Sequence, residues 1–321
     1  MLLRTPEEEK YLDGVRRVAA GRAIASLLEN VFDLDLFGKI KGKSVTVEEM
    51  ADLLGVHPAS ARLIGQALCK EGILLYKDGK LSNHPLVDKF LSTDNLIRQE
   101  FSVIRKNTWT LEAMRERLMN PRSTHGYQDL NDEIFYYGFH PRRMAWGEEM
   151  TQIYDFTPHR VLLDVAGAAG SHCIGIRKHN PHLRCMLFDL PKSEPFAHKL
   201  IGDAGMSDSI SFHGGSFLTD DLPRGADVAL VSNALHDWPP ETVPAILRRI
   251  YDALEPGGTL LVGEFFFEDD WTGSMEAVFQ AFILNTEGWQ PSYKEMSDLA
   301  SGVGFVDLER RPNLLVGRKK G

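Results

Sequence analysis

The first third of the chain has apolar residues at helical spacing, followed by one short hairpin pattern. The spacing predicts a long helix over residues 7–34 and a second helix over residues 46–55, where a threonine and a glutamate three positions later form a capping box. A third helix is predicted over residues 57–72, and an Asp-Gly turn predicts a hairpin over residues 73–81. Two helices followed by a hairpin predict a winged-helix unit.

After residue 160 the pattern changes to short β-rich runs. The first five runs alternate with helical segments and predict a doubly wound, mostly parallel sheet, while the last two predict an antiparallel hairpin at its edge. The predicted strands are Val161–Val165, Cys185–Asp189, Ile210–Phe212, Asp227–Ser232, Thr259–Phe265, Gly304–Leu308 and Leu314–Gly317. The sequence therefore predicts an α/β Rossmann-like domain over residues 156–321, preceded by a mainly helical domain over residues 1–155.

The composition is that of a globular protein. The 321 residues are 43% hydrophobic and 25% charged, and a chain of this length predicts two domains. No apolar run reaches the roughly 18–20 residues of a membrane span, and the first residues lack the apolar stretch of a signal peptide. The three cysteines are scattered, which fits a reducing compartment. We therefore expect a cytoplasmic protein without a membrane partner.

The charge distribution argues against a nucleic-acid partner. The formal net charge is −9, whereas nucleic-acid binders concentrate positive charge. Residues 43–89 carry six basic and six acidic side chains, and the second helix of the predicted winged helix offers only Arg62 and Lys70. We expect this unit to join two copies of the chain in a homodimer rather than to bind DNA.

The clearest candidate for a ligand site is the run Val161–Gly170, which predicts a buried strand, a turn of small residues and the start of a helix. Small residues let a ligand approach the backbone, and the helix N-terminus offers free N–H groups. A second strand ends at Asp189, 19 residues after Gly170, where a carboxylate can bind both hydroxyls of a ribose. Dinucleotide sites share these features. Asp164, however, would repel a pyrophosphate and would tolerate the cationic groups of S-adenosylmethionine.

Both acids also have a purely structural interpretation. Asp164 could cap the following helix while the small residues serve only tight packing, and Asp189 could be a turn residue at the end of its strand. The coincidence of the two acids with the small-residue turn favours the ligand site.

A candidate base follows the fourth predicted strand. Ligands bind at the carboxyl ends of strands in such sheets, which brings His236 to the site. An imidazole can accept the proton of a phenol, and Glu264 at the end of the fifth strand could orient it. The alternative is a structural histidine, with methyl transfer achieved by positioning alone. No metal site is expected, because His236 and Asp237 would need a further ligand that the sequence does not offer.

Together these runs resemble the small-molecule O-methyltransferases of the caffeic acid and hydroxyindole type, a class I S-adenosylmethionine-dependent family with bacterial natural-product relatives. The resemblance spans residues 10–320. Its shared motifs are D-V-A-G-A-A-G, F-D-L-P, G-G-S-F, L-H-D-W, L-E-P-G-G, V-G-E and A-S-G-V-G-F. It implies a winged-helix dimerisation domain, a methyltransferase domain and S-adenosylmethionine as cofactor.

The resemblance also implies roles for individual residues. The glycine loop would line the methionine part of the cofactor, the acid of F-D-L-P would bind the ribose, and the two residues after G-G would contact adenine. The implied cofactor-binding residues are Asp164, Ala166, Gly167, Gly170, Asp189, Leu190, Ser216, Phe217 and Ser232. The implied catalytic residues are His236 and Glu264, and the implied substrate residues are Phe135, Phe139, Ala281 and Asn285.

The chain departs from the family pattern at several of these positions. The family usually has D-V-G-G-G-T-G, so Ala166 and Ala168 replace glycines, and their methyl groups could crowd the ligand or require an unfavourable φ. Ser216 replaces a common adenine-side acid. Gln290 stands where a second catalytic carboxylate is common, with Glu287 nearby.

The predicted function is methyl transfer from S-adenosylmethionine to a small aromatic metabolite, by O-methylation in secondary metabolism. The aromatic residues near the pocket favour a flat acceptor. The departures keep open C- or N-methylation, or a non-methylating reaction such as a decarboxylation or a pericyclic step on the same fold.

Overall fold

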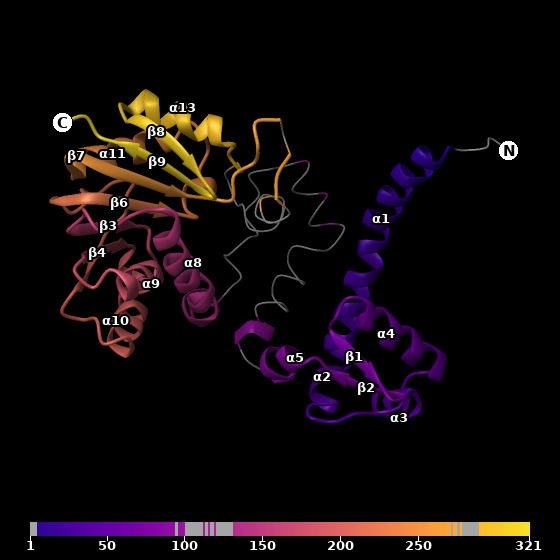
Figure 1. Ribbon diagram of the computed structural model, residues 1–321. Coiled ribbons are helices and arrows are strands. Elements are labelled where there is room, and N and C mark those ends of the chain that lie inside the picture. The colour runs from indigo at the N-terminus through magenta and orange to yellow at the C-terminus, as the bar shows by residue number, and fades with distance from the viewer. Residues whose placement is uncertain are drawn as a thin grey trace. The chain divides into compact units, whose positions relative to one another are not determined.

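The protein is described here from a computed structural model, shown in Figure 1, that covers residues 5–93, 96–99, 112, 115, 119, 131–270, 272–274, 277 and 289–321. The chain divides into two compact units, Met1–Ser102 and Val103–Gly321. The predicted domain boundary after residue 155 stays a prediction. In the described part of the chain, no helix is both long enough and apolar enough to cross a membrane.

The first unit is mainly helical. Its elements are α1 (Pro6–Asp33), α2 (Leu36–Lys39), α3 (Val47–Leu54), α4 (Pro58–Lys70), β1 (Leu74–Lys77), β2 (Lys80–Asn83) and α5 (Pro85–Phe90). The capping box predicted for α3 is present, since the Thr46 side chain accepts a hydrogen bond from the backbone N–H of Glu49 and the Glu49 carboxylate accepts one from the N–H of Thr46. Gly55 ends this helix in the left-handed conformation.

The predicted hairpin forms between β1 and β2, which pair antiparallel. Asp78 and Gly79 both have positive φ, of 51° and 77°, as a two-residue hairpin turn requires. Leu74 and Leu81 project into a core shared with α2, α3 and α4. The capping box and the Asp-Gly turn therefore form where the sequence predicted them.

The second unit contains the sheet and its covering helices. Its elements are η2 (Ile134–Gly138), α8 (His140–Ile153), β3 (Val161–Val165), α9 (Ser171–His179), β4 (Arg184–Asp189), η3 (Pro191–Ser193), α10 (Glu194–Asp203), β5 (Ile210–Gly214), β6 (Ala226–Ser232), η4 (Leu235–Asp237), α11 (Val243–Ala253), β7 (Leu254–Gly263), α13 (Tyr293–Val303), β8 (Val306–Arg311) and β9 (Leu314–Arg318).

The seven strands are arranged in the order β5-β4-β3-β6-β7-β9-β8. The five strands from β3 to β7 are parallel to their neighbours, and β9 pairs antiparallel with both β7 and β8. The predicted α/β class, with its parallel sheet and antiparallel C-terminal hairpin, is confirmed.

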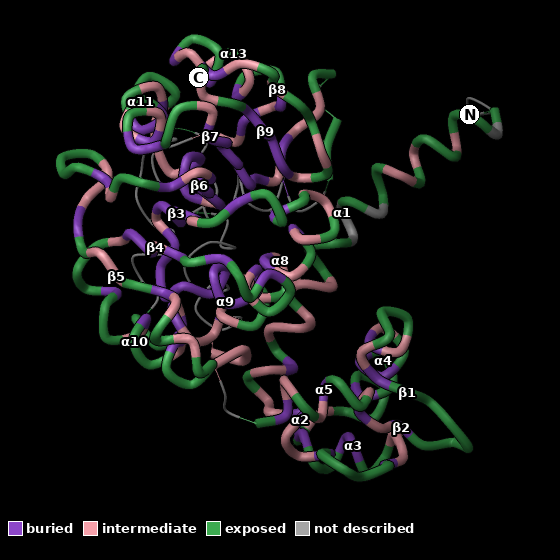
Figure 2. Tube along the Cα trace, turned by 60° about the vertical axis from the view of Figure 1, so that its left-hand side comes forward, coloured by how far each residue is buried: buried purple, intermediate pink, exposed green. Residues whose placement is uncertain are grey.

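The sheet separates two apolar cores. Consecutive strand residues such as Leu162 and Leu163 face opposite sides of the sheet, as the two-residue period of a strand requires. One face packs against α11 and α13 and the other against α8, α9 and α10, as Figure 1 shows. Figure 2 shows the central strands as the most continuously buried part of this unit. The carboxyl ends of β3, β4, β6 and β7 lie at one edge of this sheet, where the polar residues of the site gather.

Candidate active site

The turn after β3 has a strained backbone. Ala166 and Ala168 have φ values of 57° and 52°, and Gly170 has 78°. The left-handed region costs a residue with a side chain about 1–2 kcal/mol, which glycine avoids. The unfavourable φ predicted for both alanines is therefore confirmed. Gly167 is constrained differently, since an added Cβ would lie 2.5 Å from the buried carboxyl group of Asp164.

Asp189 lies at the end of β4 and is tied to this turn. Its Oδ2 accepts a hydrogen bond of 2.7 Å from the backbone N–H of Ala168, and its Oδ1 accepts one of 2.7 Å from the N–H of Leu190. Burial raises the pKa of its carboxyl group above the ordinary value. The carboxylate therefore holds the small-residue turn against the second strand while facing a cavity.

The cavity has a volume of about 550 Å³, within the range of small-molecule sites. It is lined by residues at or just after the ends of five strands, β3 to β7, by His172 of α9 and by the segment from η2 into α8. The lining residues are Phe135, Tyr136, Phe139, Arg142, Arg143, Trp146, Ala166, Gly167, Ala168, His172, Asp189, Leu190, Lys192, Gly215, Ser216, Phe217, Leu218, Asn233, Ala234, Asp237, Trp238 and Phe265.

Most of the predicted cofactor residues line this cavity. Ala166, Gly167, Asp189, Leu190, Ser216 and Phe217 are part of its wall. The remaining three lie behind it. Asp164 is fully buried beneath the turn, Gly170 starts α9, and the Ser232 hydroxyl accepts a hydrogen bond of 3.2 Å from the indole of Trp146. Six of the nine predicted cofactor residues therefore line the cavity, and the other three do not.

Aromatic residues of η2 also line the cavity. Phe135 belongs to η2, a π-helical turn of the kind often found at functional sites, and Phe139 ends that turn. The guanidinium of Arg143 lies 4.5 Å from the ring centroid of Phe135 and 5.3 Å from that of Phe139. Both predicted aromatic substrate residues therefore line the cavity. The other two predictions, Ala281 and Asn285, fall outside the described residues, as does Glu287.

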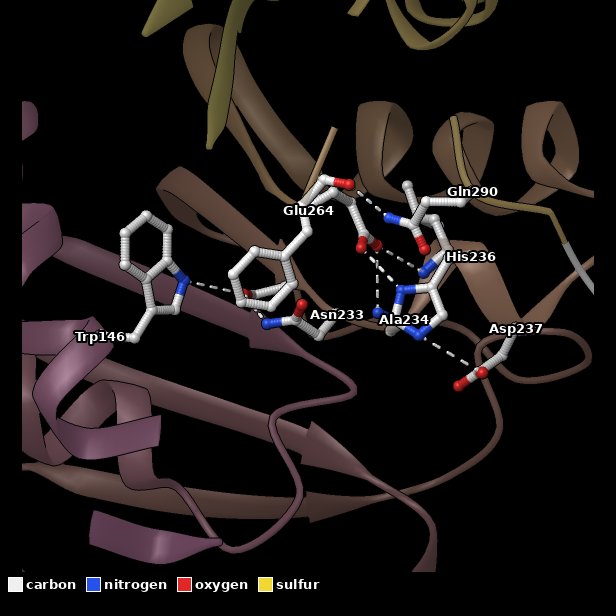
Figure 3. Close-up of polar contacts among 10 residues, drawn as sticks. Trp146, Asn233, Ala234, His236, Asp237, Glu264 and Gln290 are labelled. Carbon is white, nitrogen blue, oxygen red and sulfur yellow. Dashed lines mark hydrogen bonds and ion pairs between the residues drawn. The ribbon is translucent and has the colours of Figure 1, made fainter. Parts of the chain in front are cut away.

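His236 and Glu264 form a buried pair at the ends of β6 and β7 (Figure 3). The imidazole Nδ1 lies 2.6 Å from Glu264 Oε2, and Glu264 Oε1 accepts hydrogen bonds from the N–H groups of Ala234 and Leu235. The imidazole Nε2 lies 3.4 Å from Oδ1 of Asp237. Asp237 lines the cavity, whereas His236 is not among the described residues that line it.

The pKa values of His236 and Asp237 are both shifted in this group. Burial by itself lowers the pKa of His236, but the neighbouring carboxylates of Glu264 and Asp237 outweigh burial and raise it to about 9. Burial raises the pKa of Asp237 to about 6, and the positive charge on His236 limits that increase. At neutral pH the imidazole is therefore protonated and the Asp237 carboxyl group is mostly ionised.

A second buried polar pair lies beside the small-residue turn. His172, the second residue of α9, lines the cavity, and its Nδ1 lies 3.9 Å from Asp164 Oδ2. Neither ring nitrogen of His172, nor Oδ1 of Asp164, has a hydrogen-bond partner within the described part of the chain. Burial raises the pKa of Asp164 to about 7 and lowers that of His172 to about 3. Orphaned polar atoms at a cavity wall are what a polar ligand would satisfy.

The sequence analysis did not single out Arg143 or His172 and gave Asp237 no catalytic role. Signals for the first two were present, since His172 comes two residues after the small-residue turn and Arg143 lies one helical turn after Phe139. Gln290, in the place of a second carboxylate, donates a hydrogen bond of 2.6 Å to the carbonyl of Phe265. The described ranges contain no group of three or more histidine, cysteine and acidic side chains that could hold a metal ion.

Comparison with known families gives one match that spans most of the second unit. Residues 122–306 match the model of the O-methyltransferase domain. The matched segment includes the small-residue turn, Asp189 and the His236–Glu264 pair, and it contains every residue that lines the cavity.

Individual proteins match over nearly the whole chain. The 8-O-methyltransferase TcmO of tetracenomycin polyketide synthesis from Streptomyces glaucescens is 28% identical, with 93% of each chain covered. The N,N-dimethyltransferase OxyT from Streptomyces rimosus is also 28% identical, covering 91% of this chain and 90% of its own. Among solved structures, PigF with SAH superposes with a TM-score of 0.76 at 24% identity, covering 96% of this chain and 99% of PigF.

Proposed function

The chain belongs to the O-methyltransferase family, and from this premise we propose that it transfers a methyl group from S-adenosylmethionine to an oxygen of a small aromatic metabolite. The observation that carries the proposal is the cavity itself. Its wall includes the small-residue turn and Asp189, which we call the cofactor end, and Phe135, Phe139 and Asp237, which we call the acceptor end. A nucleoside and a flat acceptor would fit these two ends and face each other.

The cofactor end fits its ligand by position and by chemistry. When bound, S-adenosylmethionine supplies an electrophilic methyl group on a sulfonium sulfur. Asp189 would accept the ribose hydroxyls, as the acid at the end of the second strand does in related nucleotide sites. Ser216 and Phe217 would flank the adenine. Gly167 lines the cavity, and because an added Cβ there would clash with Asp164 and Leu187, only glycine lets the turn pack this closely on the strands.

The acceptor end would hold a planar ring between the aromatic residues of η2 and the residues after β6. Phe135 and Phe139 offer ring edges and faces, and Arg143 keeps both rings in place through its contacts with them. The main contribution of this end is orientation, because in-line displacement at carbon needs acceptor and sulfonium to be aligned.

The acceptor proton would leave through the group of Asp237, His236 and Glu264. The prediction that His236 is the base stays open, but Asp237 has the better position because it lines the cavity and His236 is not among the described residues that do. We infer that Asp237 receives the proton and that the protonated His236, held by Glu264, fixes the Asp237 carboxylate at 3.4 Å. An ionised carboxylate with a pKa near 6 is a better base than an ordinary aspartate.

Transfer to nitrogen is the second candidate. The relative OxyT, at the same 28% identity as TcmO, is named for N-methylation. Either acceptor atom can use the same aligned cavity, so the atom has to be identified from the product.

The proposal predicts that the protein transfers labelled methyl groups from S-adenosylmethionine to a hydroxylated polycyclic aromatic acceptor, with the product position read by mass spectrometry and NMR. Asp189→Ala should lower affinity for S-adenosylhomocysteine at least 100-fold, because the charged hydrogen-bond acceptor for the ribose is lost. The control is Asp208→Ala, which removes an exposed acid. Tight binding by Asp189→Ala would exclude the ribose role.

We further propose that the chain acts as a homodimer in the cytoplasm. Tyr11, Val15 and Val18 lie on one face of α1 and are 74%, 52% and 82% exposed, which leaves an apolar face for a second copy to cover. Cys69, Cys173 and Cys185 are all free thiols, as in a reducing compartment. Light scattering should give twice the mass of one chain, and the mass of a single chain would exclude the dimer.

A further inference from the structure

His172 is a polar side chain in an unusual position. It is 4% exposed, yet it lines the cavity, and both of its ring nitrogens lack a hydrogen-bond partner within the described residues. Buried polar groups in proteins are nearly always paired, and an imidazole kept only for packing would normally bond to the backbone or to a neighbouring side chain. The imidazole is therefore a candidate to form hydrogen bonds with a ligand in the cavity.

The backbone around His172 is firmly fixed. Helix α9 packs closely on α8, and an added Cβ at Gly147 would lie 2.7 Å from the carbonyl oxygen of His172. At Gly175, one turn further along α9, there is no room for a Cβ against the backbone of Met144. His140 Nδ1 lies 2.8 Å from the hydroxyl of Ser171 and secures the first residue of α9. The imidazole is thus presented from a rigid support.

The groups around the imidazole carry both signs of charge. The Asp164 carboxyl group lies 3.9 Å from His172 Nδ1, with Oδ1 unpaired among the described residues. The positive charge of Arg143 helps to lower the pKa of His172, although burial is the larger cause, and the first turn of α9 adds its free N–H groups. The imidazole is neutral and offers one N–H donor and one nitrogen acceptor. The Asp164 carboxyl group, the Arg143 guanidinium and the donor and acceptor nitrogens of His172 together complement a zwitterion.

We propose that His172 binds the α-amino-carboxylate end of the cofactor, with Asp164 and Arg143 supplying the complementary charges. This assignment rests on the proposed function, since the amino-acid end is the zwitterionic part of S-adenosylmethionine. It adds a binding residue at a position where the sequence motifs assign none. The ribose and adenine ends of the ligand are served by Asp189, Ser216 and Phe217, which leaves His172 to recognise the remaining end.

The test compares two ligands that differ only at that end. S-Adenosylhomocysteine carries the amino acid, whereas 5′-methylthioadenosine lacks it. His172→Leu, which keeps the size and removes both polar nitrogens, should weaken S-adenosylhomocysteine about 10- to 100-fold in calorimetric titration and leave 5′-methylthioadenosine within about twofold. His172→Gln, which keeps a donor and an acceptor, should recover most of the affinity.

His179→Leu is the matched control, because His179 lies exposed at the far end of the same helix and should change neither affinity. Thermal unfolding of each variant shows whether the site is still folded. Equal weakening of both ligands, or no change in either, would overturn the role of His172 while leaving the proposed function intact. Failure of the unmodified protein to bind either ligand would overturn both.

Discussion

The cofactor half and the acceptor half of the cavity are built in different ways. The cofactor half depends on the backbone, since Ala166, Ala168 and Gly170 take left-handed φ values and the N–H of Ala168 donates a hydrogen bond to Asp189. The acceptor half depends on side chains, since Phe135 in η2 and Asp237 in η4 come from distant segments and line the same cavity only because the chain packs that way. Few residue types fit a turn whose backbone forms the site, so the cofactor half can be recognised in the sequence as a motif. The side chains of the acceptor half can be replaced, and its chemistry changed, without a change of fold.

The largest expected effect that separates the two halves is the loss of charge at Asp237. Asp237→Asn should lower kcat about 100- to 1000-fold and leave S-adenosylhomocysteine affinity unchanged, because the base is lost while the backbone-built half is untouched. Initial rates and calorimetric titration measure the two quantities.

The control for Asp237 is Asp252→Asn on the exposed side of α11, which should match the unmodified protein. An unchanged kcat in Asp237→Asn would mean that the acceptor half works by orientation alone. A loss of cofactor affinity of similar size would mean that the two halves are not independent.

The pH dependence distinguishes the two candidate bases within the acceptor half. A base acts when deprotonated, so activity rises with pH through its pKa. With Asp237 as base, kcat/KM should rise about tenfold per pH unit below the pKa of about 6 and then level off. With His236 as base, the rise should continue to about pH 9, because only about 1% of that imidazole is neutral at pH 7.

Stopped assays from pH 5 to 10, in buffers of constant ionic strength, measure this profile. Asp237→Asn should remove the rise near pH 6 if the assignment is right. A rise near pH 9 in the unmodified protein would return the role of base to His236.

The same contrast explains what the sequence could predict. The strand Val161–Val165 was predicted with its observed bounds, and the acid at the end of β4 was placed beside the turn, because parallel strands bring their carboxyl ends to one edge. The contact of His236 with Glu264 followed from the same rule. Such features can be predicted from the order and direction of the strands alone.

Side-chain orientation did not follow from topology. His236 and Asp237 are adjacent in the chain, and only the packing of the folded chain decides that the imidazole contacts Glu264 while Asp237 lines the cavity. Likewise, Arg143 reaches Phe135 because η2 adds a π-turn before α8, which no spacing rule anticipates. The acceptor half therefore had to be found in the structure.

The smallest expected effect tests whether the backbone-built half is strained by its own side chains. Ala166→Gly and Ala168→Gly should each raise the free energy of unfolding by about 0.5–1 kcal/mol, because relief of the left-handed strain exceeds the added entropy of glycine in the unfolded chain. Ala169→Gly is the matched control. That buried alanine lies in the same turn without a positive φ, so the substitution should destabilise the protein. Urea unfolding measures all three. Destabilisation in every variant would mean that the methyl groups of Ala166 and Ala168 contribute packing that outweighs the strain, and the turn would then be adapted to alanine rather than merely tolerant of it.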